Sequence, residues 1–187
     1  MAPSIYQRSP VPGDRLCQGE ILSSVIRVRL DPSKIGDAPP SIIQVEYSYA
    51  IILTQACDLA QDFIKRQRQE PHLPDVLFCQ LPTAAELMAT LSGNTRIWDR
   101  IKINKDERYH FLQKIPAERD LHGEGLPELG VDFKHYFTIP TDEVYRRIEL
   151  GPTRRRAVLC TPYLEHLSSR FAYFMSRVGL PTDHVSE

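Results

Sequence analysis

The architecture of this chain has to accommodate one strongly apolar segment, Ile42 to Leu53. Apolar and polar residues alternate in its first half, and its second half, residues 49–53, reads YAIIL without interruption. Alternation is typical of a strand with one solvated face, whereas a continuous apolar run indicates a strand that is covered on both faces. We therefore expect a β-strand whose carboxyl end lies inside a core.

Other segments also have the composition of strands, with β-branched and aromatic residues between turn residues. They lie at residues 19–30, 75–81, 108–115, 131–139 and 156–160. The segment 131–139 alternates throughout, which predicts one strand with Val131, Phe133, His135 and Phe137 on a single face.

Helical signals fall at residues 59–69, 82–103, 141–147 and 162–178. Asp58 has the side chain of an N-cap for the first of these helices. Gly93 and Asn94 divide the second into two helices. Thr161 and Pro162 open a C-terminal amphipathic helix, and Gly179 is expected to end it.

Together these elements predict an α+β fold, namely a small antiparallel barrel or curved sheet with flanking helices and a C-terminal amphipathic helix. A length of 187 residues fits one domain. Residues 1–18 are rich in Pro and Ser, so we expect a flexible N-terminal segment followed by a single domain over 19–187.

Composition excludes several classes of protein. The chain has 23 Lys and Arg against 24 Asp and Glu, and 42% of its residues are hydrophobic, which excludes disordered, collagen-like, coiled-coil and generally polybasic proteins. No apolar run approaches the length of a membrane span, and the first residues lack a signal-peptide core. The four cysteines are widely spaced, as in reduced thiols, so we expect a cytoplasmic protein.

Two segments support a resemblance. TQACDL, residues 54–59, and PYLEHLSSRFAYFMSRVGLP, residues 162–181, resemble segments of uncharacterised bacterial proteins of similar length that share a TQxCDL motif. The order of a strand beginning GE, a Pro-rich loop, an apolar strand with a polar end and a third apolar strand resembles the MazF/PemK-like toxins. That resemblance implies an SH3-like barrel and, as a functional expectation, metal-independent cleavage of single-stranded RNA.

The first candidate site is the polar sequence after the apolar strand. Cys57 would lie at a helix N-terminus, which favours a thiolate, but the adjacent Asp58 disfavours it. A general base would have to come from His72, His110 or His135 through folding. The alternative, which the residues favour, is a small buried thiol beside a structural cap.

Thr54, Gln55 and Asp58 have two interpretations. They form a ligand-binding polar cluster at the sheet end, or they satisfy the hydrogen bonds of a turn and a helix cap. Both remain open, because Gln55 has no obvious structural role.

The second candidate site is a dense basic run around Gly151, made of Arg146, Arg147, Arg154, Arg155 and Arg156. If a tight turn folds the two groups together, their guanidinium groups share an edge that would bind phosphates or an acidic protein. Tyr136 and Tyr145 would then offer stacking surfaces for bases. The alternative is a solvated turn in which these arginines pair with nearby glutamates.

No His or Cys residues have metal-ligand spacing and no nucleotide-binding motif is present, so neither a metal nor a cofactor is expected. The leading hypothesis is a bacterial accessory or recognition module, beside a toxin or phage-defence system, that binds a nucleic acid or an acidic protein through the Arg-rich edge. A homodimer through the C-terminal helix stays open. The alternatives are a MazF/PemK-like endoribonuclease, in which Arg154 or Arg156 stabilises the transition state with help from Thr54, Asp58 or a histidine, and a Cys57-dependent enzyme.

Overall fold

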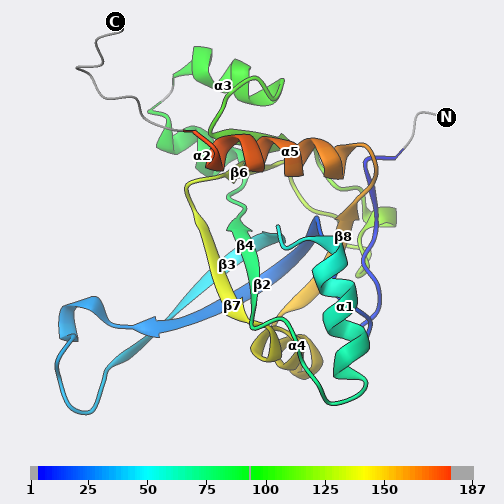
Figure 1. The fold of residues 1–187 in the computed structure, drawn as a ribbon. Coiled ribbons are helices and arrows are strands. Elements are labelled where there is room, and N and C mark those ends of the chain that lie inside the picture. Colours follow the sequence, from blue (N-terminus) through cyan, green and yellow to red (C-terminus); the bar gives the residue numbers. More distant parts are fainter. Residues whose placement is uncertain (1–3, 93, 178–187) are drawn as a thin grey trace, which may run out of the picture.

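The computed structural model describes residues 4–92 and 94–177 and shows an α+β fold (Figure 1). Its strands are β1 (Tyr6–Arg8), β2 (Glu20–Leu30), β3 (Ile42–Ile52), β4 (Asp75–Gln80), β5 (Tyr109–Leu112), β6 (Leu129–Asp132), β7 (Tyr136–Pro140) and β8 (Arg154–Leu159). Its α-helices are α1 (Ala56–Arg66), α2 (Ala84–Thr90), α3 (Thr95–Lys102), α4 (Thr141–Leu150) and α5 (Tyr163–Met175). The predicted fold class is confirmed.

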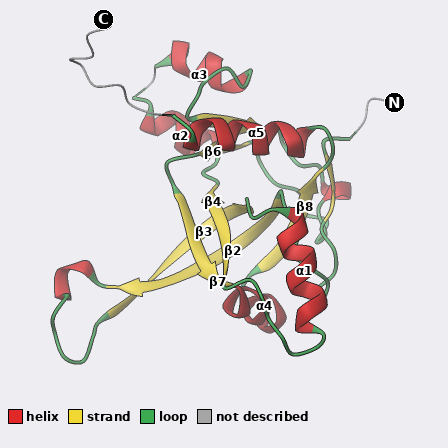
Figure 2. Ribbon diagram, viewed as in Figure 1, coloured by secondary structure: helices red, strands yellow, loops and turns green. Residues whose placement is uncertain are grey.

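Six strands form a strongly curled antiparallel sheet in the order β1-β8-β2-β3-β4-β7, which makes a half-barrel. A separate hairpin joins β5 to β6. Helices α1 and α4 lie on one side of the half-barrel, and α5 crosses its other end together with α2 and the hairpin (Figure 2). The predicted curved sheet with flanking helices is therefore what the residues build.

Strand β3 enters the core as its sequence predicts. Ile51 and Ile52 are both fully buried, and they belong to different hydrophobic clusters because successive side chains of a strand point to opposite faces. The cluster around Ile51 includes Leu167 of α5 and also Phe133, which follows β6, and the cluster around Ile52 includes Phe78 of β4. The apolar run therefore supplies both faces of the sheet.

Strands β2 and β3 continue well beyond the sheet. Strand β8 pairs with β2 only at Glu20–Ser23, and β4 pairs with β3 only at Ala50–Ile52, whereas the β2–β3 ladder runs on to Leu30 opposite Ile42. The result is a two-stranded projection, residues 27–45, which we call the β2–β3 arm (Figure 1).

The segment 131–139 is not one strand, so that prediction was wrong. Strand β6 ends at Asp132 and β7 begins at Tyr136, after a turn in which the His135 N–H donates to the Asp132 carbonyl at 2.8 Å. The Asp132 carboxylate also accepts from the Lys134 N–H. This side-chain bond is the kind by which Asp interrupts a ladder, and it turns His135 outward while Phe133 stays buried.

Helix α1 begins three residues earlier than the sequence predicts. Its N-cap is Gln55, not Asp58, and Asp58 lies in the first turn. The Ala56 N–H donates instead to the side-chain oxygen of Gln18, 38 residues away in the chain, at 3.3 Å. The cap therefore comes from tertiary structure, which no local pattern could reveal.

The N-terminal segment is more ordered than its composition suggests. Strand β1 pairs with β8, with Tyr6 opposite Leu159, and both Tyr6 and Leu16 are buried. At the other end, α5 is described to Met175, and the expected stop at Gly179 lies outside the described residues. None of the helices in the described ranges has the length and apolar character that crossing a membrane requires.

Candidate functional site

The TQACD segment forms an exposed polar rim at the carboxyl end of β3. Thr54 has a structural role, because its hydroxyl accepts a hydrogen bond from the Leu77 N–H at 2.7 Å. Gln55, Cys57 and Asp58 are exposed, and the Cys57 sulfur lies 3.6 Å from the Gln55 side-chain oxygen and 3.7 Å from an Asp58 carboxylate oxygen. The interpretation of Cys57 as a buried thiol was wrong. No histidine is among its hydrogen-bond partners in the described part of the chain.

Arg155 lies inside the protein. Its guanidinium makes two bonds to the Glu20 carboxylate, at 2.6 and 2.8 Å, and its remaining N–H groups donate to the carbonyls of Val11, Asp14 and Arg15. All of its donor capacity is thus used, and the three bonds to carbonyls fasten the N-terminal segment over the sheet.

Arg156 is also buried, on the opposite face of β8. It pairs with Asp120 at 2.6 and 2.8 Å and reaches Glu124 at 3.0 Å. Burial alone would raise the pKa of Asp120, but hydrogen bonds from Arg156 and from backbone N–H groups lower that pKa to about 2. Asp120 is therefore an ionised anchor for Arg156.

The five arginines do not share one exposed edge. Alternate residues of a strand face opposite sides, so Arg155 is separated from Arg154 and Arg156 by the sheet itself. The accessible arginines have acidic partners, since Arg154 pairs with Glu124, and Arg146 and Arg147 pair with glutamates on their own helix. The alternative of a turn with paired arginines describes these three residues better.

The two predicted sites also lie apart from each other. Across β2, Ser23 is level with both Arg154 on β8 and Tyr49 on β3. Thr54 is five residues beyond Tyr49, which is roughly 16 Å along a strand. The rim at Thr54 is therefore well separated from Arg154 along the sheet.

Sequence reasoning missed the β2–β3 arm as a surface. Three of its large apolar side chains are freely exposed, Leu30 at 56%, Ile35 at 76% and Ile42 at 63%. Both of its edges lack a third strand among the described residues. The signal was present in the alternation of residues 25–30 and 42–46, but it was interpreted as strands with one solvated face and not as an isolated pair.

A second feature that the sequence did not reveal is a cavity of about 520 Å³ between β3, α2 and the β5–β6 hairpin. Three tyrosines, Tyr47, Tyr49 and Tyr109, contribute to its walls. Its charged lining residues are Glu46, Glu86, Arg108, Asp132 and His135. We call this cavity the tyrosine cleft.

The guanidinium of Arg108, which lines the tyrosine cleft, is held by neighbouring side chains of the protein. Arg108 makes two bonds to Asp132, at 2.7 and 2.5 Å, and its guanidinium lies 4.7 Å from the centre of the Tyr109 ring. Glu86 closes the capping box of α2 with Thr83. Glu46, in contrast, has no hydrogen bond or ion pair within the described ranges.

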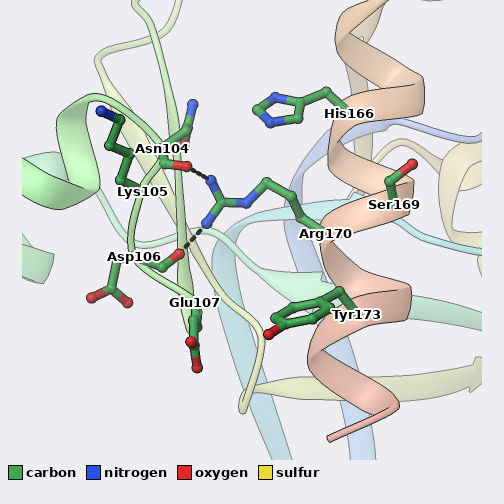
Figure 3. Close-up of a pocket in the computed structure, with 8 residues that line it drawn as sticks. All are labelled: Asn104, Lys105, Asp106, Glu107, His166, Ser169, Arg170 and Tyr173. Carbon is green, nitrogen blue, oxygen red and sulfur yellow. Dashed lines mark hydrogen bonds between the residues drawn. The ribbon is translucent and has the colours of Figure 1, made fainter.

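A smaller cavity of about 290 Å³ lies between α5 and the loop that follows α3 (Figure 3). Arg170 points from α5 across this cavity and donates to the carbonyls of Asn104, Asp106 and Tyr109. These bonds hold the loop against α5. Because they occupy the guanidinium, the arrangement is a structural clamp.

Comparison of the chain with protein-family models, with curated protein sequences and with solved structures finds no match. In the described ranges, no group of three or more His, Cys, Asp or Glu side chains converges as metal ligands would. Two candidate surfaces follow from the geometry, namely the β2–β3 arm with its exposed apolar side chains and the tyrosine cleft.

Proposed function

We propose that this protein is a recognition module that binds a protein partner through the β2–β3 arm. The observation that carries the proposal is the projection of a two-stranded ribbon with free edges and exposed Leu30, Ile35 and Ile42. Natural proteins shorten, cover or charge such edges, because an open edge recruits another strand. An arm that keeps its edges open and exposes three large apolar side chains fits a surface that a partner covers.

The chemistry of the arm favours an extended, acidic segment of that partner. Added strands gain affinity from main-chain hydrogen bonds and specificity from alternate side chains. Arg27 and Arg29 lie on β2, and neither forms an ion pair in the part of the chain that the structure describes. An added strand with Asp or Glu opposite these two arginines would extend the β-ladder at the free edge of the arm and would neutralise both guanidinium groups.

A nucleic acid has less support as the partner. Arg155 and Arg156 are buried and paired, and the other three arginines of the predicted run, Arg146, Arg147 and Arg154, pair with glutamates. The arm itself carries Arg27, Arg29 and Lys34 against Asp31 and Asp37, which leaves little positive field for a phosphate backbone. The endoribonuclease alternative loses support for the same reason, and a setting beside a toxin or defence system stays a prediction.

Site-specific photocrosslinking in cells of the source organism tests the proposal. A photoreactive amino acid at Leu30 or Ile35 should capture one discrete partner. The same group at Ile64 of α1 is the matched control, because Ile64 is exposed to the same 56% as Leu30 but lies away from the arm. Arg29→Glu should abolish capture at Leu30 and leave the thermal unfolding temperature unchanged.

Two results would contradict the proposal. Equal capture at Leu30 and Ile64 would show that the arm has no special role. A shift of single-stranded RNA in a gel that Arg154→Glu abolishes, with no protein captured at the arm, would favour nucleic-acid recognition instead.

A further inference from the structure

A small cavity between β1, β5 and α5 contains two histidines. Its volume is about 80 Å³, and it is lined by His110 of β5 and His166 of α5, whose ring centres lie 5.3 Å apart. This volume is enough for a few water molecules or for one small ion. We call it the histidine cavity.

His110 has an unpaired nitrogen at this position. The residue is only 4% exposed, and its Nδ1 has no hydrogen-bond partner within the described ranges. A neutral imidazole has one donor and one acceptor nitrogen, and buried polar atoms of native proteins almost always have a partner. The unpaired nitrogen of His110 therefore points to a polar ligand from outside the chain.

The positive charge beside the histidine cavity favours an anion as this ligand. Arg170 extends from α5 on the same side as His166 (Figure 3). Its guanidinium donates to the carbonyls of Asn104, Asp106 and Tyr109. These three acceptors carry no net charge, so they leave the positive charge of Arg170 uncompensated.

No carboxylate is among the described residues that line the histidine cavity. Its polar side chains other than the two histidines are those of Tyr6, Lys102, Asn104, Gln113 and Tyr163. Asp106 acts on Arg170 from the neighbouring loop. The Asp106 carboxylate accepts from the N–H groups of Arg108 and Tyr109, however, and lies outside the lining of the cavity. An anion in the cavity would therefore meet hydrogen-bond donors and no carboxylate.

The two imidazoles are neutral at pH 7 because of their surroundings. Burial, followed by Arg170 and His166, lowers the pKa of His110 to about 3, and burial and Arg170 also lower the pKa of His166. An anion between the rings has the opposite effect, because a negative charge stabilises an imidazolium. Binding of an anion is thus coupled to uptake of a proton, and its affinity rises as the pH falls.

We propose that the histidine cavity binds a small oxyanion, such as formate, acetate or phosphate, between His110 and His166 and beside the positive charge of Arg170. His166, the more exposed of the two histidines, takes up a proton from the solvent as the anion enters, and both rings donate an N–H to the anion. The oxyanion comes from a carboxylic acid or from phosphate, which share this chemistry. None of these residues belongs to the β2–β3 arm, so this inference is independent of the proposed function.

Titration of the full-length protein with sodium formate, acetate and phosphate, followed by NMR of the histidine ring signals, tests this site. The buffers are MES and HEPES, whose ions are larger than the cavity. We expect saturable shifts of the His110 and His166 signals. The dissociation constant of formate should be about tenfold lower at pH 6 than at pH 7, as uptake of one proton requires. Tighter binding of phosphate than of formate would assign the site to phosphate, and the reverse would assign it to a carboxylate.

Substitutions separate the two histidines from general electrostatic attraction. His166→Gln should weaken formate binding at pH 6 about tenfold or more and remove its pH dependence, because glutamine donates a hydrogen bond but takes up no proton. His110→Phe should weaken binding as well but keep the pH dependence. His122→Gln is the matched control, since His122 is an exposed histidine that does not line the cavity, and it should leave binding unchanged.

Several results would overturn the inference. They are an absence of saturable shifts up to about 50 mM formate, equal dissociation constants at pH 6 and pH 7, and equal weakening by His166→Gln and His122→Gln. Equal affinity for benzoate would also overturn it, because an anion of that size binds only at an open surface. Equal affinity for chloride would overturn the choice of an oxyanion.

Discussion

Arg155 and Glu20 form a two-point ion pair that lies entirely inside the protein, with side chains 1% and 0% exposed. Glu20 also accepts from the Cys17 N–H, and Arg155 donates to three backbone carbonyls of residues 11–15. Every polar atom of the pair is thus engaged, which is what makes a buried pair tolerable. The pair links β2, β8 and the N-terminal segment at one point.

Glu20→Gln should destabilise the protein strongly, because it leaves the charge of Arg155 buried without a counterion. The expected loss is about 3–5 kcal/mol in the free energy of unfolding, measured by urea denaturation. Arg154→Gln is the matched control, since Arg154 belongs to the same strand but pairs with Glu124 at the surface, and it should cost less than about 1 kcal/mol. Equal losses would contradict the internal role of Arg155.

Acid should weaken the protein through Asp120. The pKa of this carboxyl is lowered to about 2 in the folded state, mainly by Arg156 and against the effect of burial. A lowered pKa contributes stability that is complete above the unfolded value of about 3.9 and is lost as the pH falls through about 2. The contribution is about 2 kcal/mol, and Asp120→Asn should remove the part of the pH dependence that lies between pH 4 and pH 2 in urea titrations.

The sequence predicted the elements whose signals are local. The apolar run ending at Leu53 indicated a strand buried on both faces, and Asn94 marked the division between α2 and α3, where its side chain accepts from the Ile97 N–H. Such signals need only a few neighbouring residues, so one sequence suffices to detect them.

The missed features depend on residues that are distant in the chain. From the sequence, Arg155 was predicted to belong to a surface run with its neighbours. Its partner Glu20 lies 135 residues away in the chain, so no local pattern connects the two. The TQACD segment was correctly placed at the end of a strand, but the cap from Gln18 and the exposure of Cys57 follow from tertiary packing. The tyrosine cleft joins β3 to a hairpin some 60 residues later, and nothing local connects them.

His110 should make stability fall at mildly acidic pH. Burial, followed by the nearby Arg170 and His166, lowers its pKa to about 3, and its Nδ1 has no hydrogen-bond partner among the described residues. The unfolded chain takes up a proton below pH 6.5 while the folded protein does not, so stability is complete above pH 6.5 and declines toward pH 3. His110→Phe should flatten urea titrations between pH 6.5 and pH 5 by on the order of 2 kcal/mol. An unchanged slope would show that His110 is protonated or hydrated in the folded state.

Cys57 and Cys79 should differ sharply in their access to alkylating reagents. Cys57 is exposed at the start of α1, whereas Cys79 is buried, its thiol donates to the Asp132 carbonyl at 3.0 Å, and burial raises its pKa. At pH 8, iodoacetamide should therefore modify Cys57 in the native protein and Cys79 only after unfolding, as mass spectrometry of tryptic peptides would show. The rate at Cys57 tests the Cys57-dependent enzyme, because an activated nucleophile reacts rapidly well below pH 8 whereas an ordinary exposed thiol does not. Cys57→Ser supplies the control, and we expect the ordinary rate, since the sulfur faces Gln55 and Asp58 and no histidine.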